Sequence, residues 1–271
     1  MNIKNSQLKR AEYTIARALL FSWMLMIFVT ACSDKNDDPQ PEEEVPTETG
    51  AAVPYYTLQR VENLAVETDD ENPTEVKTAV LFSLEYKKEQ PLSYAKTTFW
   101  DISLTGLYNS FFGGNNASNS TNLGYQGPGK GGITLVEKAF DEVVDIPTET
   151  AFETGAGLIG TDINGAFGEA IGWYLYDFGG DLVNDGRENK KHVAYALGES
   201  IIINTNTGTK KEIPARTIIL RTAKGDYAKI KMISCYKDVF ARDEMFRDTP
   251  HMFFTFEYVI VPAGSTKFEI R

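Results

Sequence analysis

The feature that most constrains the fold of this chain is a pair of β-rich runs near the C-terminus. They are residues 217–222 and 227–236, and the four turn-forming residues between them include Gly225. Two such runs joined by a short glycine-containing turn predict a β-hairpin. Alternate side chains of the second run share one face: Ala228, Ile230, Met232 and Ser234. The other side chains of this run point to the opposite face: Tyr227, Lys229, Lys231 and Ile233. We therefore expect one face to cover a core and the other to lie largely in water.

A later run, residues 252–261, is dense in aromatic and β-branched residues and can pair with this hairpin at the centre of an antiparallel sheet. Further β-rich runs occur at residues 78–86, 98–104 and 200–204. The sequence contains no internal repeat and no sustained amphipathic helix. It is long enough, at 271 residues, to bury a substantial core. The sequence therefore predicts an all-β domain built on an antiparallel sheet.

The N-terminus has the pattern of a secretion signal. Residues 1–17 are polar and basic, and residues 18–31 form an apolar run of fourteen. That length suits a signal-peptide core and is too short for an ordinary membrane span. The run ends in Val-Thr-Ala before Cys32, which resembles a bacterial lipobox. We expect residues 1–31 to be a signal peptide and Cys32 to be lipidated; the alternative is an uncleaved anchor with an incidental cysteine.

Residues 32–52 are predicted to be an acidic linker, because they lack the apolar residues needed to fold. Acidic residues directly after a lipidated cysteine resemble the surface-export signal of Bacteroidetes lipoproteins. We therefore expect a lipid anchor in the outer membrane with the domain on the cell surface; a linker that faces the periplasm is the alternative. The folded domain would then span residues 53–271.

Composition excludes several classes of function. The net charge is −11 although the leader is basic, and such an acidic domain is a poor partner for nucleic acid. Two histidines, with no Ser-His-Asp, zinc or phosphate-loop arrangement, predict a protein that is not an enzyme. Carboxylates such as Asp177 and Asp181 are too common here to indicate a glycosidase. Of the two cysteines, one is the predicted lipidation site, so no intrachain disulfide framework is expected and Cys235 is predicted to be an inert thiol on the face opposite Met232.

Two glycine-rich stretches interrupt the β pattern. Residues 113–130 are rich in Gly, Asn and Ser, and we expect a long loop that cannot pack a core and that is a candidate for binding. Residues 155–180 also hold an aromatic group: Trp173, Tyr174, Tyr176 and Phe178. Residues 155–160 have GxGxxG spacing, but the surrounding sequence lacks the strand, helix and acidic residue of a dinucleotide-binding fold.

Several motifs in this order resemble the HmuY family, which are haem-binding lipoproteins of Bacteroidetes. Besides the lipobox, the resemblance is carried by Trp100-Asp101-Ile102, residues 129–132, Ile146-Pro147-Thr148, residues 221–229 and residues 254–258. It extends from about Tyr55 to the C-terminus. It implies an all-β HmuY-like fold, capture of haem for iron acquisition, and delivery of the haem to an outer-membrane receptor.

The chain departs from the family in its haem ligands. Family members hold the iron between two histidines or two methionines placed between the turn at Pro147 and the C-terminal hairpin. Here no methionine occurs between Met26 and Met232, and no histidine precedes His192. The region after Pro147 is also shortened. The axial pair of the family is therefore absent, and any haem ligation must differ.

His192 is the leading candidate for a metal ligand, because it follows the apolar, aromatic segment. A histidine beside two lysines is more often a surface residue. The ring group of Trp173, Tyr174, Tyr176 and Phe178 is a candidate flat wall for a porphyrin, with ordinary strand packing as the alternative. Other donors remain open: Tyr195, Met245, His251 and Met252. Neighbours such as His251 and Met252 are expected on opposite faces of a strand.

Two functions follow as hypotheses. The first is capture of haem or a porphyrin-like ligand, and it predicts an apolar slot near residues 173–178 with His192 or a tyrosine pointing in. The second is a diverged lipoprotein that binds a peptide, a glycan or a protein partner. It predicts a filled aromatic cluster with His192 in solvent.

Overall fold

The structure is a computed structural model that describes residues 50–271. The predicted signal peptide, the lipidation site Cys32 and nearly all of the predicted linker lie outside the described residues. The described residues all belong to one compact unit. The backbone N–H of Val53 already donates to Glu85 O at 2.7 Å, which places the predicted first residue of the domain inside the fold.

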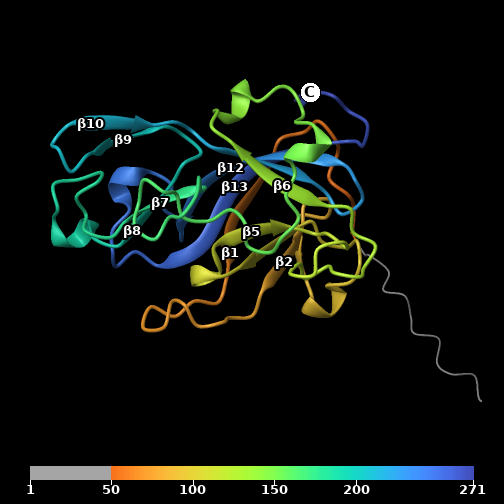
Figure 1. Cartoon of the computed structure of the whole chain (residues 1–271), viewed down its shortest axis with the longest axis horizontal. Coiled ribbons are helices and arrows are strands. Elements are labelled where there is room, and N and C mark those ends of the chain that lie inside the picture. Colours follow the sequence, from red (N-terminus) through yellow and green to blue (C-terminus); the bar gives the residue numbers. More distant parts are fainter. Residues whose placement is uncertain (1–49) are drawn as a thin grey trace, which may run out of the picture. The chain divides into compact units, whose positions relative to one another are not determined.

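A five-stranded antiparallel sheet forms around the predicted hairpin (Figure 1). Its strands, in spatial order, are β1 (Gln59–Ala65), β13 (His251–Val261), β12 (Tyr227–Tyr236), β11 (Thr217–Arg221) and β6 (Gly132–Val136). Ile218 pairs with Ile230 across the hairpin, and Met232 pairs with Phe256 on the neighbouring strand. The hairpin and its pairing with the last long strand are therefore confirmed.

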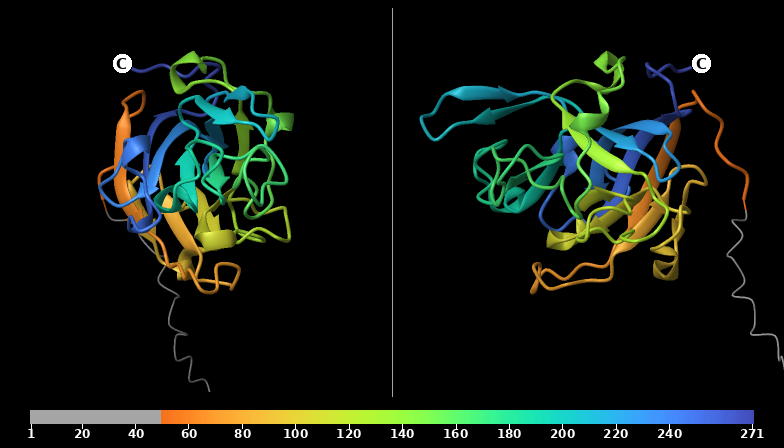
Figure 2. Two further views of the ribbon diagram at one scale, coloured as in Figure 1. Left: turned by 90° about the vertical axis from the view of Figure 1, so that its left-hand side faces the viewer. Right: turned by 45° about the vertical axis from the view of Figure 1, so that its right-hand side comes forward.

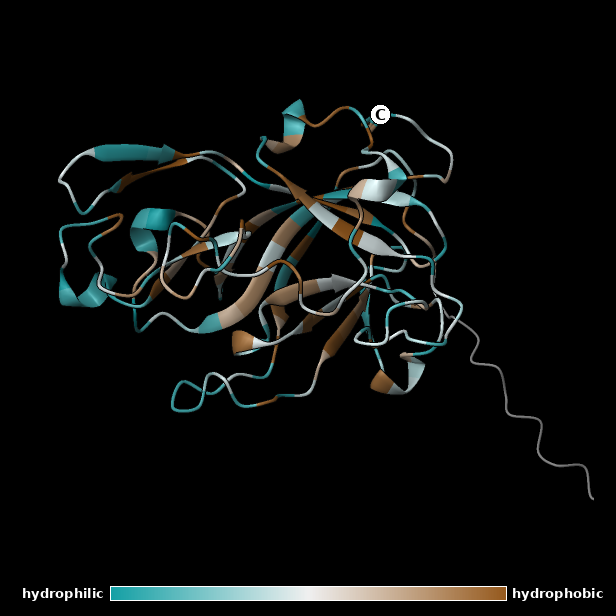
Figure 3. Ribbon diagram, viewed as in Figure 1, coloured by the Kyte–Doolittle hydropathy of each residue, from teal (hydrophilic) through white to brown (hydrophobic). Residues whose placement is uncertain are grey.

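A four-stranded sheet lies on the other side of the main core. Its strands are β3 (Lys88–Gln90), β2 (Val80–Ser83), β4 (Ile102–Thr105) and β5 (Phe111–Gly114). Phe82 meets Phe256 of the first sheet edge to face, with ring centroids 5.8 Å apart. The Tyr258 hydroxyl donates to Leu84 O at 2.7 Å. Figure 3 shows hydrophobic residues along the strands of both sheets and hydrophilic residues on the outer loops.

Two small sheets and six short helical turns complete the described part. The small sheets are β7 (Tyr174–Asp177) with β8 (Val193–Ala196), and β9 (Ile201–Asn204) with β10 (Lys210–Ile213). The 3-10 turns are η1 (Leu92–Tyr94), η2 (Leu107–Asn109), η3 (Phe140–Glu142), η4 (Glu149–Ala151), η5 (Glu188–Lys190) and η6 (Arg242–Glu244). The β9–β10 hairpin extends away from the larger sheets (Figure 2). Within the described residues no helix is long and apolar enough to cross a membrane, and the architecture is all-β and antiparallel as predicted.

The second face of the hairpin is covered as well, so the prediction that it lies largely in water is wrong. A second apolar cluster, which includes Phe140, Val143 and Ile219, packs there. Lys229 is only 3% exposed, because its Nζ donates to Phe140 O at 2.7 Å and to Val143 O at 2.9 Å. Burial lowers the pKa of this ammonium group. The carbonyl groups of Phe140, in η3, and of Val143, just after it, therefore accept the hydrogen bonds that water would accept from an exposed lysine.

The alternation of β12 breaks near its end, which changes the position of Cys235. The pairing with β13 shifts register between Met232 and Ser234. A bulge moves later side chains to the other face of a strand. Cys235 is therefore buried in the same apolar cluster as Ala228 and Met232, and the prediction that it lies opposite them is wrong.

The glycine-rich stretch after β5 is a loop, as predicted, but three of its four asparagines are buried. Asn122 Nδ2 donates to Gly114 O at 2.6 Å, and Asn116 Nδ2 donates to Gly131 O at 2.6 Å. Asn115 Nδ2 donates to both Thr97 O and Trp100 O at 2.9 Å. Among the described residues, neither apolar cluster includes a side chain of this stretch. The loop is nevertheless closely hydrogen-bonded, because amide side chains satisfy the buried backbone in place of a β-ladder.

Candidate ligand pocket

A cavity of about 840 Å³ lies at the end of the domain that carries the β7–β8 sheet. Its walls come from segments far apart in sequence: η2, residues 157–171, β7, β8, the end of β12 and the start of β13. Its lining is mainly apolar and aromatic, with few charged side chains. This size and composition are typical of small-molecule sites.

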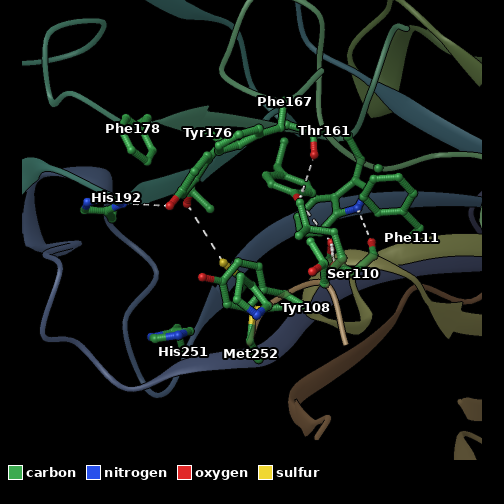
Figure 4. Close-up of a pocket in the computed structure, with 18 of the residues that line it drawn as sticks. Tyr108, Ser110, Phe111, Thr161, Phe167, Tyr176, Phe178, His192, His251 and Met252 are labelled. Carbon is green, nitrogen blue, oxygen red and sulfur yellow. Dashed lines mark hydrogen bonds between the residues drawn. The ribbon is translucent and has the colours of Figure 1, made fainter. Parts of the chain in front are cut away.

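All five ligand-binding residues predicted from sequence line this cavity. They are Trp173, Tyr174, Tyr176, Phe178 and His192. Figure 4 shows Tyr176, Phe178 and His192 on one side of the cavity, across from Tyr108, His251 and Met252. The pairing of β7 with β8 positions them, since Asp177 lies opposite Val193, the residue after His192. The predicted candidate loop at residues 113–130 is not among the segments that line the cavity.

His192 is held at the cavity by two aromatic neighbours. Its Nδ1 lies 2.9 Å from Tyr176 Oη, and its ring meets the Phe178 ring edge to face with centroids 4.6 Å apart. Among the described residues, Nε2 of His192 has no hydrogen-bond partner. A histidine with one nitrogen oriented by a neighbour and the other free is the arrangement that metal-binding imidazoles use.

The electrostatic surroundings keep this imidazole uncharged. Burial lowers the pKa of His192, and the positive charge of Arg247 lowers it further. Glu188 acts in the opposite direction, and Lys191 adds to the lowering. The neutral form, which is the form that coordinates metals, therefore prevails at neutral pH.

The tyrosines near the cavity are poor candidates for phenolate ligands. Burial raises the pKa of Tyr174 to about 12, although Ser110 and Thr161 lie within hydrogen-bond distance of its hydroxyl. Burial also raises the pKa of Tyr176. The predicted alternative Tyr195 is 1% exposed and does not line the cavity, and burial raises its pKa to about 12. Each hydroxyl is thus held in its protonated form.

His251 and Met252 both line the cavity, so the expectation that they lie on opposite faces is wrong. Met252 has a left-handed backbone with φ of 64°, which breaks the alternation at the start of β13. Both ring nitrogens of His251 have partners: Nε2 lies 2.8 Å from Asp70 Oδ1, and Nδ1 lies 3.3 Å from Thr249 O. The chain has two histidines, and both line this one cavity although 58 residues separate them in the sequence.

The other two sulfur donors, Met245 and Cys235, are both buried. Met245 is fully buried in the core, and its carbonyl accepts a hydrogen bond from Lys190 Nζ at 3.0 Å. Cys235 lines the cavity but is 2% exposed. Burial raises the pKa of its thiol to about 12, so the thiol stays protonated and is a weak nucleophile and ligand.

The aromatic rings do not form the candidate flat wall, and part of the group is packed as the alternative of ordinary strand packing predicts. Trp173 and Tyr174 are inclined at 56°, and Tyr176 and Phe178 at 68°. Trp173 also packs against Phe254 in the core, with centroids 5.6 Å apart, and its Nε1 donates to Ser110 O at 2.8 Å. Trp173 therefore forms a rigid floor, and only the later rings stand at the rim.

Several lining residues were not predicted from the sequence. The most prominent are Tyr108, Phe111, Phe167 and Arg247. Phe167 is 66% exposed, and its ring lies 5.8 Å from that of Tyr176 with an angle of 31° between them. A usable signal existed for two of them: Tyr108 and Phe167 are bulky rings within two residues of a glycine in loop sequence. Arg247 carries no comparable local signal.

Left-handed backbone is concentrated at this cavity. Four bulky lining residues have positive φ: Tyr108 (51°), Phe167 (59°), His192 (63°) and Met252 (64°). Such conformations cost on the order of 1 kcal/mol each and persist only where surrounding structure imposes them. Residues held in this way are concentrated at binding and catalytic sites, which supports a role for the cavity.

The other sequence motifs have structural roles here. Gly160 lies against the Phe111 ring, where an added Cβ would come within 2.3 Å. Asp177 accepts hydrogen bonds from the backbone N–H groups of Leu182 and Val183 at 3.1 and 3.0 Å, so it closes a turn. Within the described part of the chain, no group of three or more His, Cys, Asp or Glu side chains is placed to hold a metal ion. No protein-family model matches the chain, and no curated protein matches it.

Proposed function

We propose that this domain captures haem or a porphyrin-like ligand in the cavity beside β7 and β8. One observation carries the proposal: both histidines of the chain and a group of aromatic rings, distant in sequence, converge on a single apolar cavity. Haem needs an apolar slot for its ring and a nitrogen or sulfur donor for its iron. The lining supplies both kinds of group.

His192 is the proposed axial ligand. Its Nε2 has no partner among the described residues, and its imidazole is kept neutral by burial and by Arg247. With Nε2 on the iron, Nδ1–H would donate to Tyr176 Oη, which lies 2.9 Å away. His251 and Met252 across the cavity are the candidates for a second ligand. Both candidates for the second ligand follow the C-terminal hairpin in the chain, whereas the HmuY resemblance implies a histidine or methionine pair that precedes it.

The cellular setting is part of the same proposal. A lipid on Cys32 would anchor the domain in the outer membrane, and the acidic linker would carry it to the cell surface. The bound haem would then pass to an outer-membrane receptor for uptake. The lipobox and the acidic stretch that follows it support the anchor and the surface location, and the HmuY resemblance supports delivery to a receptor. Replacement of Cys32 by Ala should release the protein from membranes, and persistent attachment would contradict the proposal.

One observation favours the alternative, a lipoprotein that binds a peptide, a glycan or a protein partner. Trp173 is 1% exposed and packs into the core against Phe112 and Phe254. This part of the aromatic group is filled, as the alternative predicts. His192 at the rim distinguishes the two hypotheses, because the proposed iron ligation depends on this histidine and binding of the other ligands does not.

A haem titration of the full chain tests the proposal. The Soret band is followed in the ferric and ferrous states for the unaltered chain and for His192→Ala, His251→Ala and Lys191→Ala. Lys191 is a matched control, since it adjoins His192 but its Nζ pairs with Glu188 at 2.7 Å. We expect saturable binding that His192→Ala abolishes and Lys191→Ala leaves unchanged. If His192→Ala binds haem as the unaltered chain does, His192 is not the ligand. If the unaltered chain does not bind haem, the alternative function is favoured.

A further inference from the structure

Arg247 stands out among the charged residues of the cavity. Among the described residues that line it, Arg247 is the one lysine or arginine, and the lining acids are Asp70 and Glu169. Its backbone N–H donates to Asn189 O at 3.0 Å. This bond fixes the segment before β13 next to η5, close to His192 in the chain.

The guanidinium group of Arg247 has N–H donors that are not used in hydrogen bonds to the described residues. Its Nη1 pairs with Glu188 Oε1 at 2.9 Å, with the two side chains 47% and 69% exposed. No partner occurs for its Nε or Nη2 within the described residues. An arginine has five N–H donors in a planar fork and can hold a second carboxylate beside the first. An exposed ion pair of this kind contributes little by itself and is readily rearranged.

The surrounding charges restrict where an anionic group of a ligand can lie. The protein is strongly acidic, with a net charge of −11. Asp70 is paired with His251, which lies across the cavity from His192 (Figure 4), and Glu169 is the other acidic residue of the lining. A carboxylate placed there would meet like charge, which is unfavourable. The Arg247 side of the cavity is the electrostatically favourable place for it.

We infer that Arg247 recognises a carboxylate of the ligand, so that the cavity selects planar rings that carry an acidic side chain. This inference rests on the proposed function and names its specificity-determining residue. The ring would lie on the apolar floor with its acidic group at the mouth, on the side of His192. A neutral ring of the same size would lose this contact.

Two porphyrins and two variants test this inference. The probes are haem and its dimethyl ester, which differ in the charge of the two acidic side chains and share the iron and the ring. The variants are Arg247→Gln and the control Arg187→Gln. Arg187 is an exposed arginine that pairs with Asp185 at 2.9 Å and does not line the cavity. Each protein is titrated as the full chain under the same conditions.

We expect Arg247→Gln to weaken haem binding by about ten- to a hundredfold, as for loss of a charged hydrogen bond, and to leave the ester nearly unchanged. Arg187→Gln should bind both as the unaltered chain does.

Three results would overturn the inference. Equal weakening of both porphyrins by Arg247→Gln would indicate a structural role for this side chain. Unchanged haem affinity in Arg247→Gln would remove Arg247 from recognition while leaving haem capture intact. Failure of the unaltered chain to bind either porphyrin would overturn this inference together with the proposed function.

Discussion

Two neighbouring aromatic clusters of this domain differ in their exposure to solvent. The inner cluster consists of Phe112, Trp173 and Phe254, which are at most 1% exposed and meet edge to face at 5.6 to 6.2 Å. The rim cluster consists of Phe167, Tyr176, Phe178 and His192, with Phe167 66% and Phe178 51% exposed.

The contrast shows that residue type alone does not indicate a role. Trp173 and Tyr176 are three residues apart, yet one completes the core and the other faces the cavity. Rings enclosed on all sides stabilise the fold, because folding removes their whole apolar surface from water. Rings left half exposed still have apolar surface that a ligand can cover. Changes in the two clusters should therefore separate stability from binding.

The largest effect is expected in the inner cluster. Phe254→Ala should lower the free energy of unfolding by about 3–5 kcal/mol, because it leaves a cavity in a closely packed core. The comparison variant Phe178→Ala should lower it by less than about 1 kcal/mol, as is usual for an exposed side chain. Urea denaturation of both variants measures the difference. Similar losses would show that the rim cluster is part of the core.

The next largest effect is expected in the pH dependence of stability, which should reflect the buried carboxylate of Asp101. Asp101 is buried, and its carboxylate accepts hydrogen bonds from the backbone N–H groups of Leu84 and Ala223 at 2.8 and 3.2 Å. Desolvation raises its pKa from 3.8 to about 6. Because the folded-state pKa is the higher one, its stabilising contribution is complete below about pH 3.8 and is lost as pH rises through about 6.

The change that isolates this group is Asp101→Asn, since an amide does not titrate. Between about pH 4 and about pH 7 the unaltered protein should lose up to about 3 kcal/mol of unfolding free energy relative to the variant. Urea denaturation at both pH values measures this difference, and contributions from other carboxylates cancel in it. Parallel pH profiles for the two proteins would contradict the raised pKa.

Substitution of a ring in the rim cluster should lower haem affinity with little change in stability. Phe178→Ala removes a half-exposed ring beside His192 and should weaken haem binding about tenfold, or about 1.4 kcal/mol, with the fold intact. Phe240→Ala is a matched control, because Phe240 is 38% exposed and lies outside the cavity. Haem titration measures both variants. Equal affinities for the two would remove Phe178 from the site.

The smallest effect is expected from a single hydroxyl of the same cluster. Tyr176→Phe keeps the ring and removes the group that lies 2.9 Å from His192 Nδ1. Loss of one neutral hydrogen bond is worth about 0.5–1 kcal/mol, so haem affinity should fall about two- to fivefold. The Soret titration used for His192→Ala detects it. No change would mean that Phe178 alone orients the imidazole.

Much of the fold and part of the site were predictable from local sequence. The hairpin of β11 and β12 was predicted because alternation and a glycine-containing turn are local properties of the chain. The five residues predicted for the site lie within a span of twenty residues, at 173–192, and the β7–β8 pairing of neighbouring segments brings them together. Arg247, His251 and Tyr108 join them from distant segments, which no local pattern indicates.

By itself the sequence determined the all-β class, the central hairpin and the aromatic segment with His192, because side-chain period and turn chemistry act between neighbouring residues. Only the tertiary structure decided the burial of Lys229, the position of Cys235 in the core and the placement of His192 and His251 in one cavity. The burial of Lys229 depends on the segment that covers it, and the position of Cys235 depends on the bulge in β12. The placement of the two histidines depends on distant segments that close around one cavity. Such outcomes follow from packing and register across the whole domain.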